Sequence, residues 1–259
     1  MSWLRIQDEG SVRWLTIDRP ERRNAVPADG WGELRGAFED FEASAARVLV
    51  VRGAGEDFCS GVDLDPSRIV ELESAARRHE RMKDVGEAAT ALHRTTKPTL
   101  AAVDGVAVGA GMNLAIGCDV VIATDRARFS EIFVKRGLTV DFGGSWLLPR
   151  IVGMQRAKEL ALSGRIVGAA EALSIGLVLE VVPPDDLERR AGELAESFLS
   201  AAPMAQGFVK QTFNVSFESS FSEAIGWEGH AQAVALGTED AAEGVSSFVE
   251  KRDPDWKGR

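Results

Sequence analysis

Two glycine-framed segments carry the residues with the clearest chemical potential in this sequence. They are residues 58–64 (FCSGVDL) and 108–113 (VGAGMN), and each follows a β-rich apolar run. If the two turns lie side by side, their backbone N–H groups can point at one oxygen and form an oxyanion hole. Such a site favours a reaction that builds negative charge on a carbonyl oxygen, such as enolate formation from a thioester.

A proton must also move in such a reaction, and Asp141 is the first candidate to carry it. Asp141 stands in the segment 137–150 (GLTVDFGGSWLLPR), just before a glycine pair. In a pocket closed to water its carboxylate should have a raised pKa, which suits it to alternate between base and acid. The alternative is that Asp141 caps the helix that begins near Gly144.

Glu131 is a second acidic candidate. It lies two residues before Phe133, and in an extended segment the two side chains would face the same side. Glu131 is therefore a secondary acid, although a surface or salt-bridged glutamate is the favoured interpretation. Asn113 is expected to hydrogen-bond a substrate or Asp141, or simply to satisfy buried backbone groups.

Strands that alternate with helices must position these residues. The alternation predicts an α/β body with parallel pairing and right-handed crossovers, followed by a helical tail. The tail helices should complete the core or pack against another subunit. Apolar patterning predicts strands at 12–17, 47–51, 99–103, 119–123 and 178–182, and helices at 28–45, 111–116 and throughout 187–249.

Composition limits the classes of function. The 259 residues are 45% hydrophobic and 27% charged, as in an ordinary globular protein. A net charge of −10 argues against nucleic-acid and anionic-membrane partners. No apolar run reaches the roughly 18–20 residues that span a bilayer, and the N-terminus lacks a signal-peptide core. With only Cys59 and Cys118, a reducing, cytoplasmic location is the default.

Rival chemistries have little support in the sequence. The three histidines, at 79, 93 and 230, lack metal-ligand spacing, so no metal site is expected. The segment Gly53-Ala54-Gly55 is not followed by a complete GxGxxG, so no nicotinamide cofactor is expected. There is also no GxSxG elbow of a serine hydrolase.

Five blocks together resemble the crotonase superfamily, also called the enoyl-CoA hydratase/isomerase family, over approximately residues 3–259. The resemblance implies a ClpP/crotonase-like ββα spiral with a C-terminal helical trimerisation region. It implies a core with the CoA and acyl site over residues 1–195, an oligomerisation region over 196–259, and a homotrimer or dimer of trimers. The blocks are 18–25 (DRPERRNA), 58–64, 104–119, 137–153 and 248–254 (FVEKRDP).

The resemblance also implies roles for individual residues. The oxyanion donors are the N–H groups of Val62 and Ala110. Arg23 and Ala25 match a segment that contacts the CoA phosphates and pantetheine. Asp63 matches a position whose backbone helps to hold the adenine, and its carboxylate is interpreted as a turn or cap ligand. The other expected substrate and CoA contacts are Ser60, Leu64, Gly109, Phe133, Phe248 and Lys251, the last two often from a neighbouring subunit. No cofactor is expected beyond the CoA moiety of the substrate.

The chain departs from the hydratases of the family at both catalytic glutamates, whose positions hold Asn113 and Phe133. The Asp141 segment is instead similar to members that shift double bonds, especially the ring-1,2-epoxyphenylacetyl-CoA isomerases. We therefore predict an acyl-CoA isomerase with Asp141 as its acid and base. The alternatives are an enoyl-CoA hydratase that uses Glu131 or a bound water, and a non-catalytic acyl-CoA binding protein. Residues 66–92 are predicted to cover the acyl pocket.

Overall fold

A six-stranded sheet forms the centre of the molecule in the computed structural model, which describes residues 2–64 and 74–259. The strand order is β1-β2-β3-β4-β6-β9, and every neighbouring pair is parallel except β1 and β2. The predicted parallel pairing is thus confirmed. The strands are β1 (Leu4–Glu9), β2 (Val12–Ile17), β3 (Val48–Gly53), β4 (Thr99–Val103), β6 (Val120–Thr124) and β9 (Glu180–Val182).

A second, smaller sheet has the order β5-β7-β8. Its strands are β5 (Val106–Val108), β7 (Arg128–Ser130) and β8 (Val167–Gly168). The strand β4 is followed by β5 and then by α4 (Ala110–Ile116), so successive strands join different sheets before a helix begins. This strand–strand–helix succession is the predicted ββα spiral.

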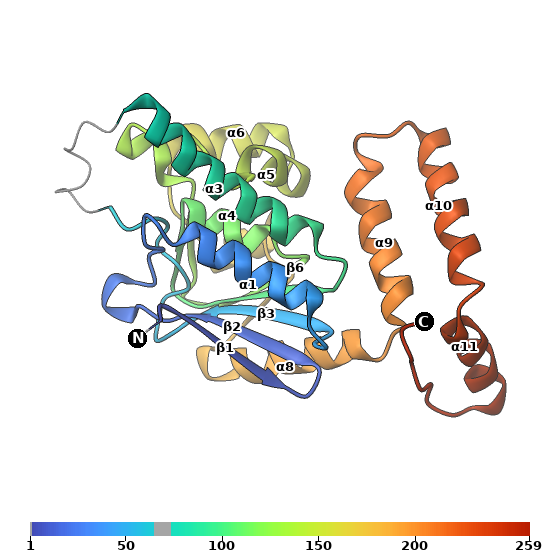
Figure 1. The fold of residues 1–259 in the computed structure, drawn as a ribbon. Coiled ribbons are helices and arrows are strands. Elements are labelled where there is room, and N and C mark those ends of the chain that lie inside the picture. The colour runs from blue at the N-terminus through green and yellow to red at the C-terminus, as the bar shows by residue number, and fades with distance from the viewer. Residues whose placement is uncertain (1, 65–73) are drawn as a thin grey trace.

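Helices cover both faces of the large sheet (Figure 1). On one face α1 (Trp31–Ala43) packs against α3 (Ala75–Arg94). On the other, α8 (Leu187–Leu199) buries Ala191 and Ala195 among apolar side chains of β2, β3, β4 and β6. The small side chains let the helix approach the sheet closely. The remaining helices of the core are α5 (Gly144–Val152), α6 (Met154–Ser163), α7 (Ala169–Ser174) and the 3₁₀ turns η1 (Pro20–Arg22), η2 (Ile132–Arg136) and η3 (Pro184–Asp186).

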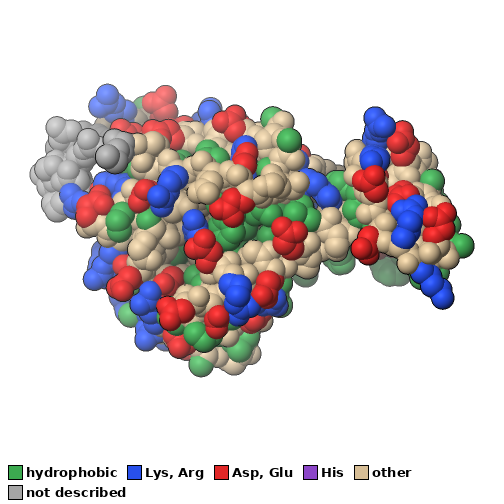
Figure 2. Space-filling model, turned by 90° about the horizontal axis from the view of Figure 1, so that it is seen from below, with side chains coloured by type: hydrophobic (Ala, Val, Ile, Leu, Met, Phe, Trp, Pro, Cys, Tyr) green, Lys and Arg blue, Asp and Glu red, His purple; other side chains and the backbone are tan. Residues whose placement is uncertain are grey.

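The last three helices form an arm that projects from the core (Figures 1 and 2). They are α9 (Pro203–Ser216), α10 (Phe221–Ala235) and α11 (Glu239–Glu250). The division predicted after residue 195 falls inside α8, so the projecting arm begins with α9. Among the helices that the structure describes, none combines the length and apolarity needed to cross a membrane.

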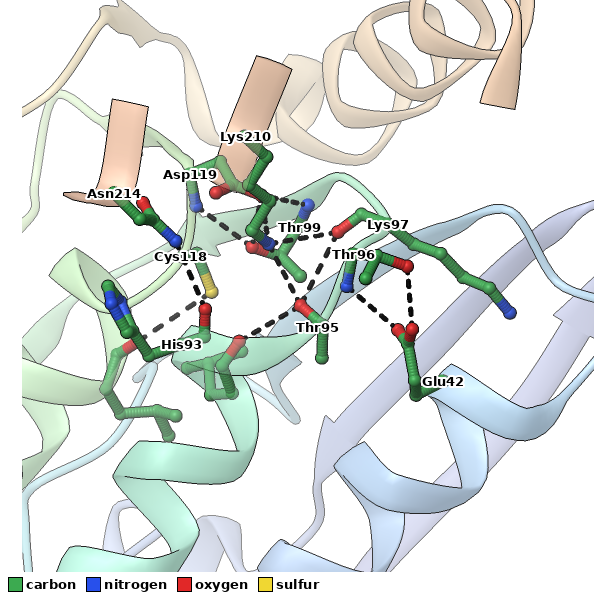
Figure 3. A network of polar contacts seen from close by, with 12 residues as sticks. Glu42, His93, Thr95, Thr96, Lys97, Thr99, Cys118, Asp119, Lys210 and Asn214 are labelled. Atoms are coloured by element: carbon green, nitrogen blue, oxygen red, sulfur yellow. Dashed lines mark hydrogen bonds and ion pairs between the residues drawn. The ribbon is translucent and has the colours of Figure 1, made fainter. Parts of the chain in front are cut away.

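A polar network fastens the arm to the core (Figure 3). The Lys210 ammonium on α9 donates hydrogen bonds to Thr95 Oγ1 at 2.9 Å, to the Lys97 carbonyl at 3.0 Å and to Asp119 Oδ2 at 2.8 Å. Asp119 Oδ2 also accepts from the backbone N–H and the hydroxyl of Thr99, both at 2.8 Å. Asp119 is thus a structural residue that links α9 to β4.

Replacement of Lys210 by methionine is expected to lower the free energy of unfolding by about 1–3 kcal/mol, because the mutation removes the donor of three hydrogen bonds, one of them to the Asp119 carboxylate. The Lys210 side chain is only 10% exposed, so water cannot readily replace it. Urea denaturation measures the change, and Lys158→Met on the exposed face of α6 is the control. Equal unfolding free energies for Lys210→Met and wild type would contradict the anchoring role.

Candidate active site

The two glycine-framed turns lie side by side. The N–H of Val108 donates to the Cys59 carbonyl at 3.0 Å, and the N–H of Cys59 donates to the Val106 carbonyl at 2.9 Å. A Cβ atom on Gly111 would lie 2.2 Å from the Cys59 carbonyl oxygen, and one on Gly61 would lie 3.0 Å from the Val108 carbonyl oxygen. The absence of side chains at both positions therefore allows the two backbones to touch.

This contact leaves two backbone donors free. Among the described residues, neither the Val62 N–H nor the Ala110 N–H has a backbone partner. Gly61 and Gly109 adopt φ values of +89° and +56°, which side chains resist, and each directly precedes one of these donors. The adjacent turns thus supply the components of an oxyanion hole.

Asp141 contacts α4, the helix that begins at Ala110 in the second turn. Its backbone carbonyl accepts hydrogen bonds from Asn113 Nδ2 at 3.0 Å and from the Gly144 N–H at 3.0 Å. Its side-chain Oδ1 is buried without a partner in the described chain, and burial raises the pKa of Asp141 to about 6. Gly143 occupies the N-cap of α5, which receives no side-chain capping bond. The helix-capping alternative for Asp141 is therefore wrong.

Glu131 is fully inside the protein, with 1% of its surface exposed. Its Oε2 accepts a long hydrogen bond from Asn113 Nδ2 at 3.5 Å. Burial is the main cause that raises the pKa of Glu131 to about 7; the hydrogen bond from Asn113 lowers this pKa, and the nearby charge of Asp141 raises it. The expectation of a surface or salt-bridged glutamate is wrong, because Glu131 directly follows Phe129 and Ser130, the buried end of β7, and is itself buried.

Asn113 connects the Glu131 carboxyl group to the backbone of Asp141. It is fully buried on α4, and its amide contacts both Glu131 and the Asp141 backbone. A Cβ atom on Gly144 would lie 2.3–2.5 Å from the amide atoms of Asn113, so that position accepts only glycine without rearrangement. Asn113 thus satisfies the Asp141 backbone, one of the two roles expected for it.

Phe133 packs over the second turn. It is buried, and a Cβ atom on Gly109 would lie 3.6 Å from the end of its ring. The Gly109 N–H donates to the Ser130 carbonyl at 2.8 Å, which holds β7 against the turn. The two positions at which a hydratase would carry glutamates therefore do lie in this site.

Comparison with known proteins identifies the family. The family model described as enoyl-CoA hydratase/isomerase matches residues 7–259. The chain belongs to the enoyl-CoA hydratase/isomerase family. It is 37% identical to a probable enoyl-CoA hydratase of Rhodobacter capsulatus, over 99% of this chain and 98% of the relative. It is 34% identical to the 1,2-epoxyphenylacetyl-CoA isomerase of Escherichia coli K12, over the whole of both chains.

Solved structures agree with this assignment. A putative enoyl-CoA hydratase from Streptomyces coelicolor A3(2) superposes with a TM-score of 0.95 at 32% identity, covering 100% of this chain and 95% of that one. The predicted crotonase fold is therefore confirmed. The names of the relatives include both hydration and isomerisation, so they do not separate the two reactions.

In this family member, the loop after β2 lies directly on the first turn. The Ser60 N–H donates to the Arg23 carbonyl at 3.0 Å. Arg19, which sequence reasoning did not select, donates to the Ala25 carbonyl at 2.7 Å and to Asp63 Oδ2 at 2.9 Å. The Asp63 carboxylate thus forms an ion pair with Arg19 that ties the loop to the first turn, and its role as a turn or cap ligand stays a prediction. The Arg23 side chain is 69% exposed, so it is accessible to a ligand.

Phe248 and Lys251 are not brought to this site within one chain. Phe248 lies on α11 and is 84% exposed, and Lys251 directly follows that helix. Both belong to the arm, whereas α4 lies within the core (Figure 1). Leu64, at the end of the first turn, is also exposed.

A cavity of about 480 Å³ lies between α3, α5, α9 and the loop that follows Asp141. His93 of α3 makes an edge-on contact with Trp146 of α5, with ring centroids 5.1 Å apart. Phe142 and Gly143 also line this space. Gly86, Ala89 and Thr90, which belong to the segment predicted to cover the acyl pocket, also line this cavity, and the assignment of that segment to the acyl pocket stays a prediction. Residues 66–73 of that segment lie outside the residues that the structure describes.

Proposed function

We propose that the enzyme isomerises an acyl-CoA thioester through an enolate, with Asp141 as acid and base. The supporting observation is the buried, unpartnered Oδ1 of Asp141 beside the paired turns. Asp141 takes a proton from one carbon of the substrate, and the electrons of that C–H bond move toward the thioester oxygen. The N–H groups of Val62 and Ala110 hold the negative oxygen. Asp141 then returns the proton to another carbon, which shifts the double bond.

The surroundings of Asp141 favour isomerisation over hydration. Hydration needs a water molecule to be held and deprotonated while a second proton reaches carbon. The Asn113 amide cannot act as a base, and its Nδ2 is committed to the Asp141 backbone and to Glu131. The ring of Phe133 cannot carry a proton. A single carboxyl group is enough for a 1,3-proton shift.

Hydration remains the second candidate because Glu131 adds a carboxyl group to the same buried cluster. In that reaction one of the two carboxyl groups would activate water and the other would protonate carbon. Relatives named as hydratases lend support to this alternative.

Solvent deuterium exchange into a panel of enoyl-CoA thioesters, followed by mass spectrometry, distinguishes these reactions. Exchange or double-bond migration without addition of water is expected for the wild type and should be lost in Asp141→Asn. Water addition that survives this mutation would overturn the proposal and favour Glu131. CoA binding without exchange on any substrate would favour a non-catalytic acyl-CoA binding protein.

We also propose that the CoA moiety of the substrate is the only cofactor and that the loop carrying Arg23 and Ala25 binds it. The exposed Arg23 guanidinium suits a phosphate group. The backbone at Ser60 and Asp63 is held against this loop by hydrogen bonds, so the loop and the turn form one surface.

A homotrimer or a dimer of trimers is the assembly we propose. The arm exposes large apolar side chains that a soluble monomer would not ordinarily present. Figure 2 shows the arm set apart from the core, with hydrophobic side chains where the two parts meet. The large exposed apolar side chains of the arm include Val209, Phe213, Phe217, Phe221, Trp227, Leu236, Phe248 and Val249, which are between 55% and 84% exposed.

The double substitution Phe213→Asp and Phe217→Asp is expected to convert the assembly to monomers, because two charges would have to be buried in an apolar contact. Sedimentation velocity measures the change. The matched control is Leu162→Asp, which changes an equally exposed apolar residue on α6 outside the arm. A wild-type protein that sediments as a monomer would contradict the proposed assembly.

A further inference from the structure

Glu131 has no role in the single-carboxyl mechanism, yet it is among the most buried polar residues described. Three acceptor atoms of the cluster are buried without a donor: Glu131 Oε1, Asn113 Oδ1 and Asp141 Oδ1. Buried polar atoms are nearly always paired, so the site lacks donors. A proton on one of the two carboxyl groups would supply such a donor.

The electrostatic surroundings of Glu131 are simple. Among the described residues, Asp141 is the one titratable group whose charge contributes to the raised pKa of Glu131. The helix α4 carries no ionisable side chain. Lys135 and Arg136 on η2 are exposed, and α6, which packs on η2, exposes its charged residues Arg156, Lys158 and Glu159. No cation therefore offsets a second negative charge in the cluster.

We propose that Glu131 is a positioning residue that shares one proton with Asp141 within the buried cluster around Asn113. The inference rests on the proposed function of Asp141. Two carboxylates in a dry pocket resist simultaneous ionisation, so they titrate as a pair. In the resting enzyme Glu131 is neutral and Asp141 carries the single charge, which leaves Asp141 free to accept a proton from the substrate.

The pair should produce a bell-shaped pH profile of kcat/KM. Below the pKa of about 6 of Asp141, the base becomes protonated and activity falls. Above the pKa of about 7 of Glu131, a second charge must be desolvated when the thioester closes the pocket, so activity falls about tenfold per pH unit. Glu131→Gln should keep the acidic limb and lose the alkaline limb, because glutamine mimics the neutral acid.

Stability provides a readout that does not depend on activity. The pKa of Glu131 is raised from 4.5 to about 7 on folding, so its favourable contribution is complete below pH 4.5 and is lost as the pH rises through 7. Glu131→Gln should therefore raise the urea midpoint at pH 8 and leave it near the wild-type value at pH 4.5. Asp141→Asn should also raise the urea midpoint at pH 8. The increase in the double mutant should be smaller than the sum of the two single increases, because either substitution alone removes the repulsion between the carboxylates.

The control is Glu188→Gln on α8, whose side chain is 72% exposed and should change neither readout. An unchanged alkaline limb in Glu131→Gln, or additive midpoints in the double mutant, would overturn the shared proton. Loss of exchange in Glu131→Gln equal to that in Asp141→Asn would also overturn it, because Glu131 would then be the proton carrier. If the urea midpoints are non-additive but Asp141→Asn retains full deuterium exchange, the shared proton is supported and only the proposed role of Asp141 in catalysis is refuted.

Discussion

Asp141→Asn is expected to lower the rate of solvent-deuterium exchange into the substrate by about 10²–10⁴-fold, the usual contribution of a positioned acid or base. Asparagine has nearly the same shape but cannot accept the proton. The local backbone should persist, because Asn113 and Gly144 bond the Asp141 main chain rather than its side chain. Exchange is followed by mass spectrometry under single-turnover conditions, so that product release does not hide the chemical step.

The control for this substitution is Asp185→Asn, which changes an exposed acid on η3. It should leave the exchange rate unchanged. An exchange rate for Asp141→Asn within about threefold of the wild type, far short of the loss typical of a general base, would contradict the assignment.

The second large effect is expected from Gly111→Ala, which should lower kcat by about 10²–10³-fold, the loss typical of one oxyanion donor. A new Cβ atom would lie 2.2 Å from the Cys59 carbonyl oxygen and 2.8 Å from its carbon, so the two turns must separate. The Ala110 N–H would then move away from the Val62 N–H, and the two groups could no longer hold one oxygen together. Steady-state kinetics on the preferred thioester measures the change.

A folding defect must be distinguished from this catalytic effect. Gly192→Ala on α8 adds the same methyl group where no other atom lies within 4 Å, so it should retain full activity. Circular dichroism and urea denaturation report whether Gly111→Ala is folded at the assay temperature. A folded Gly111→Ala enzyme with wild-type kcat would show that the paired turns do not stabilise the reaction.

Several elements of the fold could be read from local patterns. The strands β2, β3, β4 and β6 are apolar runs, and each was predicted to within one or two residues. The strands β5, β7 and β8 were not predicted, because two or three residues cannot display a periodic pattern. The strand β1 was also missed, since most of its residues are exposed at the sheet edge.

In the candidate site, too, some features could be predicted from the sequence and others could not. The glycine-framed turns and Asp141 could be found from residue types, because glycine permits close backbone approach wherever the turn stands in the chain. The environment of Glu131 could not be predicted from residue types. Its burial depends on the packing around the end of β7, and its partner Asn113 is 18 residues away in the chain. A local pattern carries no information on which distant groups exclude water.

By itself, the sequence determined the α/β alternation, the two turns and the presence of an acid before α5. The tertiary structure decided that the turns touch, that Asp141 is not a helix cap, and that Glu131 lies with Asn113 inside the protein. It also decided that the last three helices leave the core as an arm. The physical reason is that residue type sets what a side chain can do, whereas long-range packing sets its solvent exposure, its partners and therefore its proton affinity.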